Sequence, residues 1–170
     1  MTIRDILCYP DPRLSKVSQP LKVFDEQSDK LIDDMFETMA DAEGIGLAAI
    51  QIGVPLRIAV IKTEEPIVLI NPEITVLEDL MLTEEEGCLS LPGIRANISR
   101  PARIKVNAKD KQGNNFKLKA DGLLSVCIQH EIDHMDGKLF INKLTPLAKA
   151  KIDVPLRNLI ALYSEKHKKY

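Results

Sequence analysis

Two histidines and a glutamate in the last third of the chain carry the strongest chemical signal. The segment reads His130-Glu131-Ile132-Asp133-His134, so on a helix the two imidazoles lie one turn apart on the same face. In that relation both can bind one transition metal at about 2.0–2.1 Å. Glu131 would lie beside the metal, where a carboxylate can accept a proton from metal-bound water. The pattern is typical of a metal-dependent hydrolase.

Two histidines at this spacing also occur by chance. The chain contains only three histidines, however, and two of them fall in this frame. They lie on an apolar stripe of the expected helix, where an unpaired charged imidazole would be costly. The stripe consists of Leu124, Cys127, Ile128 and Met135. We therefore favour a metal site over coincidence.

A catalytic site of this kind has three protein ligands and one open position. Cys127 shares the helix face of the histidines, but it lies about 10 Å along the axis from His134, too far for both to reach one metal. Cys88 lies on a distant segment. As a thiolate it would leave a divalent site with enough positive charge to lower the pKa of bound water. The residues favour Cys88 over Glu86 or Asp133 without excluding either.

Helical and extended patterns predict the elements that hold these residues. Apolar spacing indicates an N-terminal helix over Asp25–Ala42 and the metal-binding helix over Gly122–Asp136, and Pro155 is a suitable first residue for a C-terminal helix. Strands are expected at Arg57–Ile61, Ile67–Ile70, Ile74–Leu77, Ala102–Ala108 and Asn115–Ala120, the last two forming a hairpin.

Composition narrows the class of protein. A chain of 170 residues with 45% hydrophobic content fits a single domain over residues 1–170. We expect no membrane span, because no stretch approaches 18 apolar residues. We also expect no export signal, so the three cysteines indicate reduced thiols in the cytoplasm. The net charge of −2 argues against a general nucleic-acid-binding protein, and we expect no specific DNA binding.

Three segments, in the same order, resemble the three signature motifs of peptide deformylase. They are Gly44-Ile45-Gly46-Leu47-Ala48-Ala49-Ile50-Gln51, Glu86-Gly87-Cys88-Leu89-Ser90 and Gln129-His130-Glu131-Ile132-Asp133-His134. The early segment Tyr9-Pro10-Asp11-Pro12 is also similar to that family, so the resemblance covers nearly the whole chain. Met135 stands where the family usually has Leu, a volume-conserving change that should not alter the chemistry.

The resemblance implies an α+β fold: antiparallel β-sheets around a central metal-binding helix, with an N-terminal and a C-terminal helix. It implies an enzyme that removes the N-formyl group from the N-terminal formylmethionine of nascent polypeptides and releases formate. The nucleophile would be a metal-bound hydroxide. The cofactor would be one divalent metal per chain, Fe(II) natively, with Zn, Ni or Co as substitutes.

The resemblance also implies a role for each matching residue. It places the metal ligands at Cys88, His130 and His134, catalytic roles at Glu131, Gln51 and Leu89, and substrate contacts at Gly46 and Arg95. Glu131 would act as general base and then as general acid. The side-chain amide of Gln51 and the backbone N–H of Leu89 would stabilise the oxyanion. Because methionine is apolar and unbranched, we expect a hydrophobic pocket for it, with walls at Ile45, Leu124 and Ile128.

Two other functions compete with this one. A general metallopeptidase would cut internal peptide bonds and need no formyl group. An inactive homologue could bind metal as an interaction module, although neither Glu131 nor Gln51 is needed merely to hold a metal. The C-terminal region from Lys138 contains seven lysines and one arginine against two carboxylates. This basic tail could dock on ribosomal RNA, or it could be a solvated terminus that aids solubility.

Overall fold

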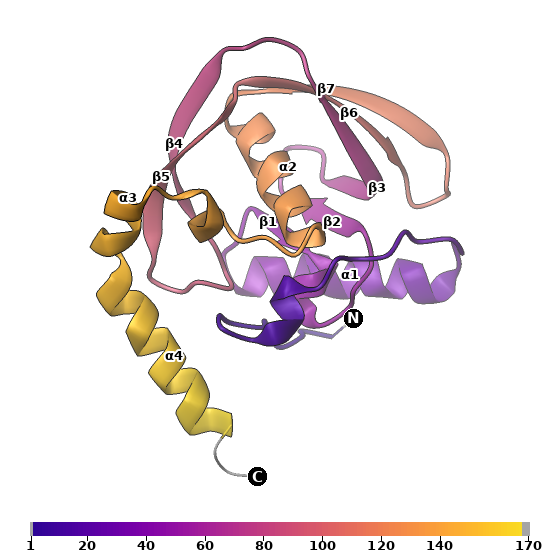
Figure 1. The fold of residues 1–170 in the computed structure, drawn as a ribbon. Coiled ribbons are helices and arrows are strands. Elements are labelled where there is room, and N and C mark those ends of the chain that lie inside the picture. The colour runs from indigo at the N-terminus through magenta and orange to yellow at the C-terminus, as the bar shows by residue number, and fades with distance from the viewer. Residues whose placement is uncertain (1, 168–170) are drawn as a thin grey trace.

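A computed structural model describes residues 2–167 of the chain. Its strands form a five-stranded antiparallel sheet in the order β1-β2-β3-β6-β7 and a separate two-stranded sheet, β4-β5 (Figure 1). The strands are β1 (Gly46–Ala48), β2 (Ile58–Ile61), β3 (Ile67–Val76), β4 (Met81–Gly87), β5 (Arg95–Pro101), β6 (Arg103–Lys109) and β7 (Asn115–Asp121). The helices are α1 (Glu26–Asp41), α2 (Gly122–Met135), α3 (Pro146–Lys151) and α4 (Asp153–His167), with short 3-10 helices η1 (Pro12–Ser15), η2 (Ala49–Ile52) and η3 (Phe140–Lys143).

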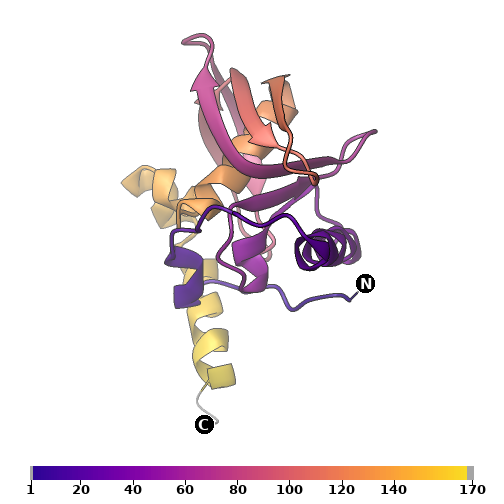
Figure 2. The ribbon, with the colours of Figure 1, turned by 90° about the vertical axis from the view of Figure 1, so that its right-hand side faces the viewer.

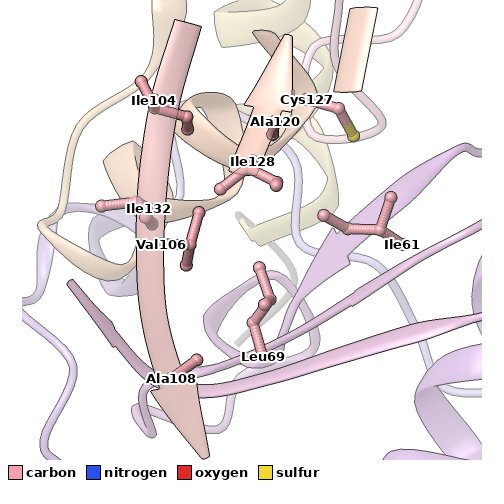
Figure 3. Close-up of a cluster of buried hydrophobic side chains, with 9 residues drawn as sticks. All are labelled: Ile61, Leu69, Ile104, Val106, Ala108, Ala120, Cys127, Ile128 and Ile132. Carbon is pink, nitrogen blue, oxygen red and sulfur yellow. The ribbon is translucent and has the colours of Figure 1, made fainter. Parts of the chain in front are cut away.

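Helix α2 is the centre of the fold, as the sequence predicts. It lies below β6 and β7 and beside β4 and β5 in Figure 1. One side of the helix packs against the inner face of the large sheet through buried aliphatic side chains (Figure 3). These are Ile61, Leu69, Ile104, Val106, Ala108 and Ala120 from the sheet, with Cys127, Ile128 and Ile132 from the helix. The two histidines therefore lie on a helix that an apolar core holds in place.

Helix α1 covers the opposite face of the sheet over β1, β2 and the start of β3. Asp25 caps it, because its side chain accepts hydrogen bonds from the backbone N–H groups of Gln27 and Ser28. The apolar face, including Ile32 and Met35, packs against side chains of β1, β2 and β3. The second view shows α1 end-on, separated from α2 by the strands (Figure 2). The two helices thus hold β1, and with it the glycine-containing first motif, in a fixed position.

The β3 region differs from the sequence prediction. We predicted two strands separated by Asn71-Pro72, but β3 is continuous through both residues. The pairing register with β6 shifts between Ile70 and Glu73, and Asn71 adopts a positive φ of 51°. Its side chain accepts a hydrogen bond from the backbone N–H of Leu21 and donates to the carbonyl of Leu21. The proline is thus accommodated at a bulge, and the strand continues.

The hairpin β4–β5 and helix α3 were not predicted. Apolar residues of β4 do not alternate with polar ones: Met81 is exposed, Glu84 and Glu85 are exposed, and the buried position is a glutamate, Glu86. The predicted β6–β7 hairpin is confirmed, with Val106 opposite Leu118. The C-terminal helix is confirmed too, but it begins at Asp153, two residues before Pro155. Among the described residues, no helix is long and apolar enough to cross a membrane.

Candidate active site

A cavity of about 510 Å³ opens beside the face of α2 that carries the histidines. Its walls come from the three segments that the motifs occupy: residues 42–46 with Gln51, the β4–β5 hairpin with the turn that follows β4, and α2. These segments lie far apart in the sequence. The antiparallel sheet arrangement brings them together around the N-terminal and middle turns of α2.

Three donor atoms converge at the floor of this cavity. The Nε2 atoms of His130 and His134 are 3.2 Å apart, and the Sγ atom of Cys88 is 3.2 Å from Nε2 of His134. All three donor atoms lie within 4.8 Å of one another. Two nitrogens bound to one tetrahedral metal at about 2.0–2.1 Å would be about 3.3–3.4 Å apart. The donor set and its spacing therefore fit a transition metal, with Cys88 as the third ligand and one position left open.

A buried ionic network orients the first histidine. Nδ1 of His130 donates to Oε2 of Glu86 at 2.8 Å. Arg100, whose side chain is 3% exposed, donates to Glu86 and also to Asp133 at 2.7 Å. Burial alone would raise the pKa of Glu86, but hydrogen bonds from Arg100 and His130 hold it below its ordinary value. Glu86 and Asp133 were the alternatives to Cys88 as the third ligand. They instead lie outside the group of three donors, where they stabilise α2, the helix that carries the two histidines.

Glu131 lies directly beside the converging donors and under the cavity. Glu131 is only 3% exposed. Its Oε2 atom is buried and has no hydrogen-bond partner among the described residues. Burial raises the pKa of this carboxyl to about 7. A Cβ atom placed on Gly46 would be only 2.3 Å from Oε1 of Glu131. The backbone of β1 therefore runs against the carboxylate, and only glycine fits there.

Gln51 is held rigidly at the cavity wall. Its Oε1 accepts a hydrogen bond from the backbone N–H of Ala48 at 2.9 Å. Its Nε2 donates to Oγ of Ser90 at 3.1 Å and lies 3.7 Å from Sγ of Cys88. An amide nitrogen carries two hydrogens, so Ser90 accepts one, and the other is donated in a long hydrogen bond to the sulfur of Cys88. Leu89, which directly follows the cysteine, also lines the cavity.

Two of the three predicted pocket walls do not reach the cavity. Ile128 is fully buried, and Leu124 packs with it against the sheet. Instead, Leu123 and Val126 line the cavity, together with the predicted Ile45. The difference follows from the helical repeat. Leu123 and Val126 precede His130 by seven and four positions and therefore share its face of α2, whereas Leu124 and Ile128 point toward the core. The prediction of Leu124 and Ile128 as walls is therefore corrected.

Arg95, for which a peptide contact is predicted, lines the cavity at an exposed position. Its guanidinium is 66% exposed and is 4.0 Å from the carboxylate of Glu85. Cys127 is confirmed as a buried thiol rather than a metal donor. Burial raises its pKa, so the thiol remains protonated in the core. Our sequence analysis did not identify Ser90, although its position two residues after Cys88 could have suggested a neighbouring role.

Sequence comparison places this geometry in a known family. Residues 3–150 match the family described as Polypeptide deformylase. The chain belongs to the peptide deformylase family. It is 49% identical over 156 residues to the peptide deformylase of Cellvibrio japonicus, covering 89% of this chain and 92% of that relative. The Pseudomonas aeruginosa peptide deformylase is also 49% identical, with 89% and 93% covered.

Solved structures of peptide deformylases share the fold. The Legionella pneumophila enzyme superposes with a TM-score of 0.88 at 46% identity, covering 96% of this chain and 98% of that one. A plant peptide deformylase gives a TM-score of 0.95 at 36% identity, covering 99% and 95%. The predicted α+β class and family are thus confirmed. Enzymes of the peptide deformylase family are metal-dependent hydrolases, and this activity agrees with the three converging donors.

Proposed function

We propose that the chain removes the N-formyl group from nascent polypeptides at the site built from Cys88, His130 and His134, with Glu131 moving the proton. One observation carries the proposal: three donor atoms with metal-ligand spacing lie beside a buried carboxylate that has an unpartnered oxygen among the described residues. A metal held by these donors supplies Lewis acidity, which polarises a carbonyl and lowers the pKa of water.

Glu131 acts first as base and then as acid. Its buried carboxylate accepts the proton of the attacking water and returns it to the amine of the departing methionine. Burial raises the pKa of this carboxyl, which favours its holding the proton between the two steps. The network of Glu86, Arg100 and Asp133 keeps His130 in place while the proton moves.

Gln51 and Leu89 stabilise the negative charge that develops on the formyl oxygen. Gln51 offers the hydrogen of Nε2 that makes only a long hydrogen bond to Sγ of Cys88, and Leu89, at the cavity wall, offers its backbone N–H. Donors fixed before the reaction need no reorganisation when the charge appears, and losing one typically costs about 3–4 kcal/mol in the barrier.

The remaining cavity residues bind the substrate. Gly46 allows the peptide backbone to run close to the carboxylate, because a side chain there would collide with Glu131. The apolar side chains of Ile45, Leu123 and Val126 form the pocket for the first methionine. Arg95, at its exposed position in the cavity lining, binds the peptide beyond that residue.

We also propose Fe(II) as the native metal, with Zn, Ni or Co able to replace it. A thiolate with two imidazoles suits any of these ions. We propose that residues 1–170 act as one catalytic domain in the cytoplasm, where its nascent substrates emerge.

The basic tail gives a further proposal, that the C-terminus docks on ribosomal RNA. Lys166 and His167 lie at the end of α4, and Lys168 and Lys169 lie outside the described residues. Deleting residues 164–170 should weaken ribosome binding at low salt, as measured by co-sedimentation. Unchanged salt-dependent binding would favour a solvated terminus instead.

Formate release tests the proposed reaction directly. Anaerobically prepared, Fe(II)-loaded protein should release formate from formyl-Met-Ala-Ser, and Glu131→Gln should release almost none at equal metal content. Cleavage of unformylated casein without formate release would instead indicate a general metallopeptidase. A metal-loaded wild type that is inactive on both substrates would indicate a binding module.

A further inference from the structure

The outer face of the β6–β7 hairpin carries three lysines that the deformylase reaction does not use. Side chains alternate between faces along a strand. Ile104 and Val106 point inward to α2, so Lys105 between them points outward. On β7, Lys117 and Lys119 flank the inward-packed Leu118 and are exposed. We refer to Lys105, Lys117 and Lys119 as the basic sheet face.

The pairing register forces like charges together on this face. Lys105 is directly opposite Lys119, and Lys117 is opposite the uncharged Asn107. Like charges in directly opposed positions destabilise an antiparallel pair. On the other side, Lys105 pairs with Thr75 of β3, which also contributes no charge. The hairpin therefore tolerates a local electrostatic cost that a single acidic residue at any of these positions would relieve.

Within residues 2–167, no carboxylate lies within 4.0 Å of the three ammonium groups. Other cations of the same hairpin are neutralised or engaged. Arg103 lies 3.6 Å from Glu78, and Lys109 donates to the carbonyl of Gly113. The acidic residues of the face are at its margins, where Glu73 pairs with Asn107 and Asp121 with Arg103. The charge of the basic sheet face is thus uncompensated within the described part of the protein.

We propose that the basic sheet face binds the phosphate backbone of RNA. The argument is charge complementarity: a protein of net charge −2 concentrates unpaired lysines on one outward sheet surface. Lys117 and Lys119 are two residues apart on one strand, about 7 Å along it, with Lys105 beside them. A row of such cations can contact successive phosphates of one strand and release their counterions. This interaction goes beyond deformylation and involves a surface separate from the catalytic cavity.

The location of the face allows RNA and substrate to bind together. None of the described residues that line the cavity belongs to β6 or β7. The cavity lies on the α2 side of the sheet, whereas the lysines point away from α2. In both ribbon views, β6 and β7 lie at the opposite end of the molecule from α4 (Figures 1 and 2). The face would therefore be a second contact, independent of the C-terminal tail, and two linked contacts increase overall binding.

A matched pair of triple variants tests the proposal on full-length, metal-loaded protein. The first, K105Q/K117Q/K119Q, removes the basic sheet face. The control, K16Q/K22Q/K62Q, removes the same charge from exposed lysines of other segments. Binding of a fluorescent 20-nucleotide single-stranded RNA is measured by anisotropy over a range of salt concentrations. Vesicles containing phosphatidylserine serve as a second polyanionic probe.

We expect the first variant to bind this RNA at least tenfold more weakly at low salt. The slope of log K against log salt should fall by about 2, since each lost phosphate contact contributes about 0.7 on a single strand. The control should keep nearly the wild-type slope. Thermal stability of the first variant should not decrease, because opposed like charges are removed.

Three results would overturn the proposal. Equal losses in both variants would mean that only net charge matters. Unchanged RNA binding in K105Q/K117Q/K119Q would mean that these lysines are merely solvated. Tighter binding to vesicles than to RNA, lost in the same variant, would identify a membrane surface as the partner. Formate release from formyl-Met-Ala-Ser should be unaltered in both variants, so failure of the RNA proposal remains distinguishable from failure of the catalytic one.

Discussion

Gly46→Ala should greatly reduce deformylase activity because it displaces the catalytic carboxylate. The added Cβ would lie 2.3 Å from Oε1 and 3.0 Å from Cδ of Glu131, and 3.0 Å from Sγ of Cys127. Carbon and oxygen atoms in contact need more than about 3 Å, so the carboxylate must move by about 1 Å. Both side chains are buried among close-packed atoms except where they line the cavity, so the displaced carboxylate leaves its position beside the donors.

The expected magnitude follows from that displacement. A misplacement of about 1 Å in a reacting group can reduce the rate about 100-fold. Overpacking a buried site typically costs about 1–3 kcal/mol in stability. We therefore expect kcat to fall about 100-fold in formate release from formyl-Met-Ala-Ser, with metal content unchanged, and a moderate decrease in the free energy of unfolding.

A double-mutant cycle tests the cause of the effect. In a Glu131→Ala background the clashing carboxylate is absent, so Gly46→Ala should then destabilise the protein much less in urea unfolding. Activity of Gly46→Ala within threefold of wild type would refute the reasoning. Equal destabilisation in both backgrounds would show that the strain comes from another neighbour, such as Cys127.

Three other outcomes are expected. Ser90→Ala should lower kcat more than it raises KM, because Gln51 then loses the hydrogen bond that orients its amide. In a Gln51→Ala background, Ser90→Ala should have no further effect on kcat. Additive losses in the double variant would contradict this role of Ser90. Glu86→Gln should weaken metal binding about 10–100-fold in chelator competition, and unchanged affinity would exclude the orienting role. The hydrogen bond from Arg4 holds the pKa of Asp34 below its ordinary value of 3.8, so its stabilising contribution is present above that pH and is lost as the pH falls below it. Asp34→Asn should therefore make the free energy of unfolding, measured in urea, less dependent on pH below pH 4. The same pH dependence in the variant and the wild type would contradict this.

The sequence alone determined the chemistry of the site. Residues i and i+4 of a helix must share a face, so the spacing of His130 and His134 was enough to predict a metal-binding pair. Local periodicity also predicted α1, α2 and the β6–β7 hairpin, because such patterns depend on neighbours in sequence. Cys88 was favoured but not established as the third donor, since no sequence rule brings distant segments together.

Only the tertiary structure decided how the segments meet. It placed Cys88 3.2 Å from His134, assigned Glu86 and Asp133 to the surrounding ion network, and brought Ser90 to Gln51. These contacts depend on the β4–β5 hairpin, in which β4 exposes Met81 and buries Glu86 and so shows no apolar alternation to recognise. The pocket walls were mispredicted for a related reason. Both faces of α2 are apolar, and only packing against the sheet showed which one is core and which one faces the cavity.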